Sequence, residues 1–588
     1  MKNYLLITLG HNSSAIFVDN SSEKQEIIGY EQERLSRLKA DSQFPIDAIN
    51  EIEHNVGYNK MRGCTILISH WFNIKLSQFH FNKYYTEKDE EKLKSYQPEC
   101  IKFVNEDFTH HDAHAFSAHA FFKYNCPEDK LTSAPHHTLV VDGFGNNEEV
   151  LSLYMTANKN EQPKLIHRVY GYHFSLGLFY QYATAFVGMK ENQDEYKFLG
   201  YEAHIDDELT IEQIDCVNHF IERGVDYFLT TWVNDAKQNE HLPVNTVIDF
   251  KALDAVRTFW YEKFKEVCDA IDLTDTTSFK ARCTIAYFIQ QICEIALSNF
   301  IEEFGVHNLT VVGGTFYNVK LNNKLLNTVD GLFCAMPLAG DQGAAIGMYE
   351  AELKEDAPAF KFDTLAWGKR RFYNFEKYAS KEKGVHYHII PKTALGTLSE
   401  VAKNIAQYVA NGRLVDVVFS NMEFGPRALG NTTTLFLPTT ANTANNNRMN
   451  HRNEVMPCAP ICTEANAKLL FDDYELERVI GSDRFMICTH DYNKLYSKQY
   501  GGVMHKKTLE PHIYTGRPQI VHEHTFMGMV LNIVELATDA KCLVNTSFNV
   551  HGNPIVFDTK DIIDNFNFQC EHAEDEKHRP VLFVINIV

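Results

Sequence analysis

Near the N-terminus, apolar and polar positions alternate in short blocks that are typical of β-strands. Apolar runs at Tyr4–Leu9, Ala15–Asp19 and Glu26–Tyr30 are separated by turn residues at Gly10–Ser14 and by a polar cluster at 19–22. Glycine, serine and asparagine in such clusters favour turns between strands. A meander of this kind followed by helices predicts a twisted sheet with helices packed on it.

The same pattern predicts further elements as far as residue 350. Strands are expected at Cys64–Ile68, Leu139–Asp142, Leu309–Val312 and Leu332–Met336. Long helices are expected at Ala252–Ile271 and Ala281–Phe304, and the second of these repeats apolar residues at i, i+3 and i+4. No internal repeat is visible in the sequence.

A change of character at Ala351–Leu395 predicts a domain boundary, because charges, prolines and aromatics mix there without a clear period. A new α/β unit begins after it, with a helix at Leu398–Ala410 and a strand at Leu414–Phe419. The last strand is expected at Val581–Val588, and the Asn-rich stretch Ala441–Asn447 is expected to be a loop. The predicted units are 1–360, a connecting segment 361–395, and 396–588.

Composition and charge limit the classes of protein to which this chain can belong. The chain has 588 residues, of which 44% are hydrophobic and 23% charged, so disordered and fibrous classes are excluded. Its 56 basic and 77 acidic residues give a formal net charge of −21, which disfavours general binding to nucleic acid or anionic membranes. The 13 cysteines are scattered without a CxxC pair, and no apolar run has the length of a signal peptide or membrane helix. We therefore expect a soluble cytoplasmic protein with reduced cysteines.

Two histidines and two aspartates are candidate metal ligands. His110 and His114 are four residues apart, so on a helix they share one face and can bind one divalent ion. Asp142 ends an apolar strand, and Asp341 precedes a helix. A metal held by these four side chains could bind phosphate oxygens. The alternatives are a surface helix in a chain with 27 histidines, an ordinary turn at Asp142 and a plain helix cap at Asp341.

Glycine-rich turns after two of the strands are candidate nucleotide contacts. Gly143 follows the Asp142 strand, and Gly313 and Gly314 follow another. Backbone N–H groups in such turns can face a phosphate. Tight packing of the chain is the alternative explanation for these glycines.

The C-terminal unit carries candidate groups for a polar, anionic ligand. Arg448, Arg452 and Arg517 could make bidentate phosphate contacts, and Asn545–Asn549 offers hydroxyl and amide groups after a strand. A set of surface arginines and an ordinary turn would look the same in the sequence.

Many of these motifs together resemble one family, the ATP-dependent O-carbamoyltransferases of antibiotic and nodulation-factor tailoring (the NodU, CmcH and TobZ type). The resemblance covers nearly the whole chain in order. In the N-terminal part the matching motifs are Gly10–Ala15, Glu31–Arg37, Phe44-Pro45, the His110/His114 segment, Val141–Gly143, Glu195–Gly200, Gly313-Gly314 with Asn318, and Gly340–Ala345. In the C-terminal part they are Glu423–Gly430, Phe485-Met486, Gly516–Gln519, Asn545–Asn549 and Gly552–Val556.

The resemblance implies an α/β protein with two domains. The N-terminal domain would have the actin/sugar-kinase-like (TsaD-like) fold, and the smaller C-terminal domain would be YrdC-like. Carbamoyl phosphate and ATP would form carbamoyl-adenylate in the small domain, and the large domain would transfer the carbamoyl group to an acceptor hydroxyl. A divalent metal (Fe, or Mg/Mn) would be bound by His110, His114, Asp142 and Asp341.

Roles for further residues follow from the same resemblance and from their chemistry. His11 would take the acceptor proton or hold the acceptor, and Lys197 would supply a cation near the reacting group, unless it is a solvated surface lysine. The nucleotide in the N-terminal domain would meet Gly143, Gly313, Gly314, Asn318 and Asp341. Carbamoyl phosphate and ATP in the C-terminal domain would meet Arg427, Arg448, Arg452, Met486, Arg517, Asn545, Ser547 and Asn549.

Departures from the family pattern remove positive charge from the expected anion site. Asn450 stands where the family has Lys, and Met456 stands where it has a second Arg. Thr432-Thr433 replaces an Arg-Ser pair, and Ser420-Asn421 replaces Gly-Arg. Arg448 could substitute for the missing Lys. Otherwise the carbamoyl donor is bound differently.

The acceptor stays open at the level of sequence. A small molecule, a sugar or a nucleoside would fit, including a hydroxymethyl-pyrimidine nucleotide or DNA, and nucleic acid is expected only as a substrate. The inserted segments Phe72–Glu99 and Thr230–Val247 carry aromatics that could stack on a flat ring or simply pack in the core: Phe79, Phe81, Tyr84, Tyr85 and Trp232. The alternative functions are a threonylcarbamoyl-type transferase or kinase of the same superfamily, and a non-catalytic adenylate-binding regulator.

Overall fold

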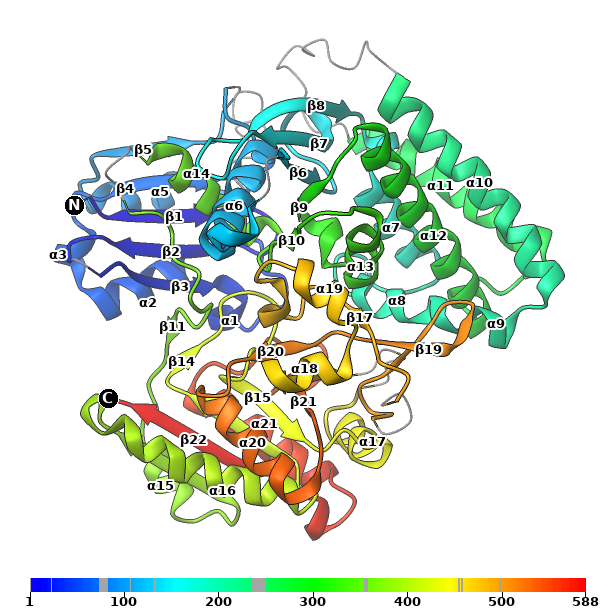
Figure 1. Ribbon diagram of the computed structural model, residues 1–588. Helices are drawn as coiled ribbons and strands as arrows, with labels where there is room; N and C mark the ends of the chain where they lie inside the picture. Colours follow the sequence, from blue (N-terminus) through cyan, green and yellow to red (C-terminus); the bar gives the residue numbers. More distant parts are fainter. Residues whose placement is uncertain are drawn as a thin grey trace.

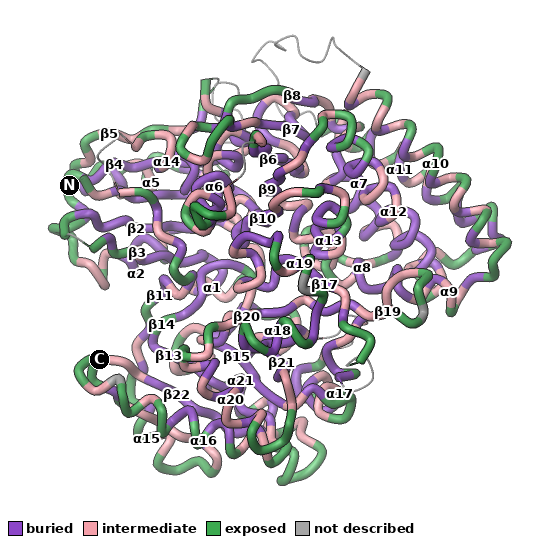
Figure 2. The backbone as a smooth tube through the Cα atoms, in the orientation of Figure 1, coloured by how far each residue is buried: buried purple, intermediate pink, exposed green. Residues whose placement is uncertain are grey.

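The computed structural model describes residues 2–22, 24–72, 83–105, 107–131, 134–234, 250–353, 358–452, 455, 458–495 and 500–588. The N-terminal part contains two sheets with helices packed on them, and the C-terminal part contains a third, larger sheet (Figure 1). Buried backbone follows the strands of all three sheets (Figure 2). In the described part of the chain, no helix is long and apolar enough to cross a membrane.

The two N-terminal sheets repeat one topology. The first has the order β3-β2-β1-β4-β5 and the second the order β10-β9-β6-β7-β8. In each, an antiparallel meander is extended by parallel strands on the side of its first strand. The strands are β1 (Tyr4–Thr8), β2 (Ser14–Asp19), β3 (Glu26–Glu31), β4 (Thr65–Ser69), β5 (Cys100–Phe103), β6 (His136–Val141), β7 (Glu149–Thr156), β8 (Lys164–Tyr170), β9 (Asn308–Val312) and β10 (Phe333–Ala335).

This duplicated arrangement is the actin/sugar-kinase-like fold, in agreement with the expected fold class. The repeat was invisible in the sequence because strand order and direction are repeated, whereas the side chains differ. The N-terminal helices are α1 (Gln32–Ser36), α2 (Ile46–Val56), α3 (Tyr58–Met61), α5 (Glu87–Ser95), α6 (His110–Asn125), α7 (Leu176–Phe186), α8 (Glu195–Tyr201), α9 (Ile205–Glu208), α10 (Ile211–Asn234), α11 (Phe250–Ala270), α12 (Phe279–Glu303), α13 (Val319–Thr328) and α14 (Ala344–Glu352).

The C-terminal part is also α/β. Its main sheet has the order β12-β22-β13-β15-β21-β16-β20, and β17, β19 and β18 form a small antiparallel sheet. The strands are β11 (Gly368–Lys369), β12 (Val385–Ile390), β13 (Val415–Phe419), β14 (Asn421–Met422), β15 (Thr432–Phe436), β16 (Ala459–Thr463), β17 (His490–Asp491), β18 (His505–Lys507), β19 (Glu510–Gly516), β20 (Gln519–Val521), β21 (Leu543–Ser547) and β22 (Val581–Ile587). The helices are α15 (Phe375–Ala379), α16 (Leu398–Ala410), α17 (Thr440–Met449), α18 (Glu464–Leu470), α19 (Asp473–Arg478), α20 (Phe526–Thr538) and α21 (Thr559–His572).

Two expectations about this part need comment. The stretch Ala441–Asn447, expected to be a loop, lies inside α17, so that prediction was wrong. Thr439 caps this helix by accepting a hydrogen bond from the N–H of Asn442, and burial of Asn446 and Met449 outweighs the poor helix propensity of asparagine. The expected connecting segment 361–395 contributes β12, which pairs with β22 at the edge of the main sheet.

The close crossing of α6 and α14 depends on a glycine. A Cβ atom added at Gly347 of α14 would lie 1.8 Å from the carbonyl oxygen of Ala113 and 2.8 Å from the nitrogen of Ser117, both in α6. These are backbone atoms, so a larger side chain would have to push the two helices apart. The crossing brings the first turn of α6 next to the segment that precedes α14 (Figure 1).

Two arginines, Arg34 of α1 and Arg37 directly after this helix, attach the N-terminal part to loops of the C-terminal part. Arg34 is buried and donates a 2.6 Å hydrogen bond to the carbonyl oxygen of Gly425. Arg37 donates to the carbonyl oxygens of Ile555 at 2.7 Å and Pro554 at 2.9 Å. The two domains are therefore joined by charged groups that reach backbone acceptors.

A chain segment of the C-terminal part also extends the second N-terminal sheet. The N–H of Ile480 donates to the carbonyl of Phe333 in β10 at 2.8 Å, and the N–H of Ala335 donates to the hydroxyl of Ser482 at 2.8 Å. Close by, the buried His490 ring contacts Glu475 at 3.1 Å and Asp483 at 2.7 Å. Burial alone would lower the pKa of His490, but the two carboxylates outweigh it and raise the pKa to about 10.

We expect Gly347→Ala to lower the free energy of unfolding by about 2–3 kcal/mol, because the new methyl group overlaps the backbone of α6. Denaturant unfolding measures this change. Gly396→Ala is the matched control, since an added Cβ there meets no atom within 4 Å. Equal stability of the two variants would contradict the proposed helix contact.

His490 should make the stability of the chain depend on pH. An unfolded histidine has a pKa of about 6.5, so between about pH 6.5 and 10 only the folded state holds the His490 proton, and the free energy of unfolding falls as pH rises. The His490→Gln variant should lack this contribution to the decrease in the free energy of unfolding. Thermal unfolding of the variant and of the wild type at pH 6.5 and 9.5 measures the difference. His219→Gln, whose side chain is 72% exposed, should keep the wild-type slope; a wild-type slope in His490→Gln would refute the assignment.

Candidate metal and carbamoyl-transfer site

The first turn of α6 is set by a capping box. Thr109 donates its N–H to the Asp112 carboxylate at 2.7 Å, and its hydroxyl accepts from the Asp112 N–H at 3.4 Å. The helix therefore begins at His110, and His114 follows one turn later on the same face. Both rings are fully buried, and their Nε2 atoms lie 3.1 Å apart.

Asp142 meets these rings from the end of β6. Its Oδ2 atom lies 3.4 Å from His110 Nε2 and 3.7 Å from His114 Nε2. Its Oδ1 atom accepts the N–H of Gly314 at 3.0 Å, which fixes the carboxylate. The preceding Gly313 has φ +108°, and a Cβ there would lie 2.2 Å from the carbonyl oxygen of Val141, so a glycine is needed for this approach.

Asp341 completes the group from the segment between β10 and α14. Its Oδ1 atom lies 3.3 Å from His110 Nε2 and 3.6 Å from His114 Nε2. One ligand atom from each of His110, His114, Asp142 and Asp341 lies within 4.8 Å of the others. The structure thus brings together the four side chains that the sequence predicted as metal ligands, from three separate parts of the chain.

The two carboxylates of this cluster are balanced by positive charge. Burial favours the neutral forms, but Asp341 and Asp142 raise the pKa of His110 to about 10. In return, the histidines hold the pKa of Asp341 well below its usual range, against the effect of burial. A proton on His110 provides one positive charge. Two imidazoles and two carboxylates are also a donor set that suits Fe, Mn or Zn, so the residues present fit a divalent metal.

A second layer of polar residues, which sequence reasoning missed, supports α6 from behind. Arg168 of β8 donates to the helix-capping Asp112 at 2.9 Å and contacts Glu149 at 2.8 Å. It also donates to Ser152 at 3.1 Å, and Ser152 contacts His111 Nδ1 at 2.8 Å. Burial raises the pKa of Glu149 to about 7, even though Arg168 opposes the shift. In the sequence, the signal for this second layer is Arg168, a single arginine within a strand.

The turn that carries His11 packs against aromatic residues of the N-terminal part. A Cβ at Gly10 would lie 2.4 Å from Trp71 Nε1, so this turn packs against Trp71. The Trp71 ring in turn meets the Phe144 ring edge to face at 5.1 Å, two residues after Asp142. His11, the next residue after Gly10, is half-buried in this turn.

The candidate nucleotide contacts of the N-terminal domain also make contacts within the protein. Gly313 and Gly314 hold Asp142 in place, and Gly143 accepts a 2.5 Å hydrogen bond from the Ser175 hydroxyl on its carbonyl. Asn318 has a structural role: its side chain caps α13 by accepting the N–H of Leu321 at 3.0 Å.

In the C-terminal part, Arg452 reaches the expected ligand-binding strand end. Its guanidinium donates to the hydroxyls of Thr546 and Ser547, the latter at 3.0 Å. Arg448 instead donates to Asn445 and lies 3.4 Å from Glu574, with 44% of its side chain exposed. Arg448 is therefore occupied at the surface, and the expectation that it substitutes for the missing Lys finds no support in its contacts.

The remaining C-terminal candidates are partly occupied by internal contacts. The Asn545 amide donates to Gln519 at 2.5 Å and to the carbonyl of Ala428 at 2.9 Å, and Asn549 donates to the carbonyl of Asn553 at 2.7 Å. Burial lowers the pKa of Arg427, which lies near Tyr317 and Tyr196 of the N-terminal part. The other two candidates are Met486, which is buried in a left-handed conformation, and Arg517, which lies between β19 and β20.

The departures from the family pattern can be located only in part. Asn450 is fully buried; its amide donates to Asn446, and its side-chain oxygen accepts from Gln569 at 3.1 Å. Met456 lies outside the described residues.

The inserted aromatics that the structure describes are mostly packed in cores. Tyr85 and Trp232 are buried, and Trp232 donates its indole N–H to the carbonyl of Phe174 at 3.3 Å. Phe79 and Phe81 lie outside the described residues.

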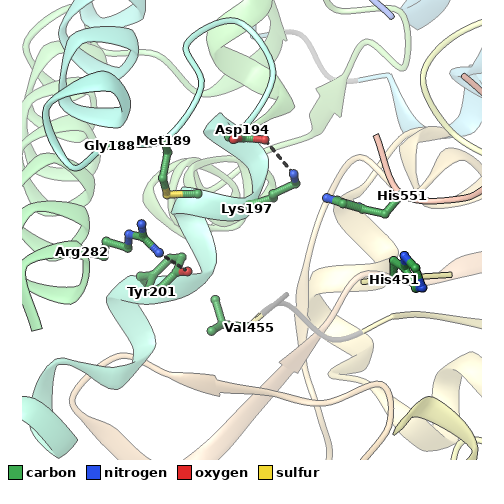
Figure 3. A pocket seen from close by; sticks show the side chains of 9 residues that line it. All are labelled: Gly188, Met189, Asp194, Lys197, Tyr201, Arg282, His451, Val455 and His551. Carbon is green, nitrogen blue, oxygen red and sulfur yellow. Dashed lines mark hydrogen bonds and ion pairs between the residues drawn. The ribbon is translucent and has the colours of Figure 1, made fainter. Parts of the chain in front are cut away.

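A cavity of about 230 Å³ separates the two domains near Lys197. Figure 3 shows Lys197 paired with Asp194, at 2.7 Å, and facing His551 across the cavity. The lining residues are Gly188, Met189, Asp194, Lys197, Tyr201 and Arg282 of the N-terminal part, and His451, Val455 and His551 of the C-terminal part. Among these, only Lys197 was predicted to act at a site.

The chain is similar to several known proteins. An uncharacterized protein of Methanocaldococcus jannaschii is 25% identical over 577 residues, which cover 95% of each chain. The nodulation protein NolO of Bradyrhizobium diazoefficiens is 29% identical over 273 residues, or 45% of this chain and 47% of its own length. Among solved structures, full-length HypF in its phosphate- and nucleotide-bound form covers 61% of this chain and 47% of its own length, at 13% identity and a TM-score of 0.29.

Models of the two domains of one family match successive parts of the chain. Residues 5–349 match the carbamoyltransferase N-terminus, and residues 406–572 match the carbamoyltransferase C-terminus. The first match alone spans more than half of the sequence. This chain therefore belongs to the carbamoyltransferase family.

Proposed function

We propose that this transferase is an ATP-dependent O-carbamoyltransferase that acts through carbamoyl-adenylate. The observation that carries the proposal is the convergence of His110, His114, Asp142 and Asp341 at the strand ends of a chain that belongs to the carbamoyltransferase family. The proposed substrates are carbamoyl phosphate, ATP and an acceptor with a hydroxyl group. The acceptor is a small molecule, a sugar or a nucleoside, and a hydroxymethyl-pyrimidine nucleotide is one candidate.

The two chemical steps are assigned to the two domains. Residues 396–588 would form carbamoyl-adenylate in two displacements: water releases inorganic phosphate from carbamoyl phosphate to leave carbamate, and a carbamate oxygen then bonds to the α-phosphorus of ATP as pyrophosphate leaves. Residues 1–360 would transfer the carbamoyl group. Arg452 with Thr546 and Ser547 supports the first assignment, because a guanidinium beside two hydroxyls can hold phosphate oxygens. In the second step the acceptor oxygen bonds to the carbamoyl carbon, and the bond from that carbon to the adenylate oxygen breaks.

The residues of the N-terminal domain would prepare this second step. A divalent ion bound by the four-residue cluster would supply positive charge opposite the adenylate phosphate. The turns at Gly143 and at Gly313-Gly314 would approach the nucleotide, and His11 would accept the acceptor proton or orient the acceptor. Lys197, held by Asp194, would place a cation near the reacting group.

Metal binding provides a direct test. His110→Ala and His114→Ala should each weaken binding of Fe²⁺ or Mn²⁺ more than tenfold, because loss of even a supporting residue around a metal costs 10- to 100-fold. Titration calorimetry and elemental analysis of the purified variants measure this. His119→Ala is the matched control, since His119 lies farther along α6 and outside the cluster. Wild-type affinity in both cluster variants would exclude a metal at this place.

The activation step is tested by pyrophosphate release from ATP in the presence of carbamoyl phosphate and Mn²⁺ or Fe²⁺. We expect Arg452→Gln to reduce kcat/KM for this release at least tenfold, which corresponds to the ~1.4 kcal/mol of a weak charge-assisted hydrogen bond. Arg579→Gln, an exposed arginine of the same domain, should retain wild-type release. ADP as the product would indicate a kinase instead, and no turnover with either metal would favour a non-catalytic regulator.

A further inference from the structure

The cavity near Lys197 is built by both domains. Its N-terminal walls come from α8, α12 and the segment after α7, and its C-terminal wall comes from the residues that follow α17 and β21 (Figure 3). Neither domain forms the cavity alone. A ligand bound there would contact the proposed activation domain and the proposed transfer domain at the same time.

The lining of the cavity is rich in groups that bind anions. Lys197 and Arg282 are cations, and the imidazoles of His451 and His551 add two potential donors. Asp194 is the carboxylate among the lining residues, and it is paired with Lys197 at 2.7 Å.

Arg282 has donor capacity left for a ligand. Its guanidinium donates at 3.4 Å to the Tyr201 hydroxyl and at 3.4 Å to the carbonyl of Val187, both neutral acceptors. Asp275 is close enough to interact with its charge. Two long hydrogen bonds use only part of the five N–H donors of an arginine.

The position of the two histidines explains how the C-terminal wall forms without the expected lysine. Asn450 uses its side chain inside the domain, as described above, but its carbonyl oxygen accepts the N–H of His551 at 2.9 Å. The next residue, His451, has φ +52° and thus turns away from the path of α17. One buried asparagine therefore anchors a backbone that presents two imidazoles to the cavity.

We propose that this interdomain cavity binds the phosphate group of a substrate, with Lys197 and Arg282 supplied by the N-terminal domain and His451 and His551 by the C-terminal domain. This inference rests on the proposed function and deepens it. Cations from the opposite domain would replace the charge that is missing at Asn450. The phosphate would belong either to the carbamoyl donor or to a phosphorylated acceptor alcohol, which share the same recognition chemistry.

Inorganic phosphate is the probe for the site itself. In calorimetric titration of the full chain with its metal, the double variant Arg282→Gln/His551→Asn should bind phosphate at least tenfold more weakly than wild type. The Asn450 bond survives in this variant, because it comes from the His551 backbone. The variant Arg282→Lys/His551→Asn should regain part of the phosphate affinity that the double variant has lost. Thermal unfolding of each variant shows that it is folded. Lys265→Gln, an exposed lysine paired with Asp269, is the control for lost positive charge.

Two kinetic measurements then distinguish the sources of the phosphate. If the donor binds there, the double variant raises KM for carbamoyl phosphate in acceptor-free pyrophosphate release. If the acceptor binds there, that KM is unchanged, and a nucleoside 5′-monophosphate, but not the nucleoside, competes with phosphate on wild type. Absence of phosphate binding in wild type, or equal affinity in wild type and double variant, overturns the inference. Absence of pyrophosphate release in wild type refutes the proposed function instead, while the titration still tests the cavity.

Discussion

The arrangement of the N-terminal domain depends on one electrostatic constraint: two carboxylates and two imidazoles meet at one largely buried point, where positive charge must balance the carboxylates. His110 and His114 are buried, and the Asp142 and Asp341 side chains are only 12% and 13% exposed, so uncompensated negative charge there is costly. The constraint links three separate parts of the fold, since α6, the end of β6 and the start of α14 must meet at one point. Gly313 and Gly347 make that meeting possible, because each allows backbone to approach where a Cβ would collide.

Charged side chains also bind fixed hydrogen-bond acceptors around the cluster and between the domains. Arg168 holds the cap of α6 through Asp112, while Arg34 of α1 and Arg37 after it bind carbonyl oxygens of C-terminal loops. These contacts are directional and buried or half-buried, so they help to define how the two domains are placed. In this placement a proposed intermediate made in one domain would face the proposed transfer machinery of the other.

The domain interface also accounts for the altered anion-binding segment. Loss of a lysine at Asn450 leaves an asparagine whose amide is satisfied internally, and the adjoining backbone instead presents His451 and His551 to the cavity shared with Lys197 and Arg282. Recognition of an anion at such a place would require both domains. Substrate binding and domain contact would therefore be coupled by geometry, without any need for a separate regulatory element.

Local pattern determined much of this protein by itself. Apolar runs located part of the strands, among them β1–β4, β6, β9 and β10, and the long helices α11 and α12. The spacing of His110 and His114, together with an aspartate at a strand end and another before a helix, predicted the metal-ligand cluster. Tertiary structure alone decided the rest. The helix α17 forms in an Asn-rich stretch because Asn445 and Asn446 are buried and Thr439 caps its first turn, and the duplicated sheets share topology rather than residues. The interdomain cavity joins residues such as Arg282 and His551 that are far apart along the chain, and contacts of that kind arise from packing, which local periodicity does not encode.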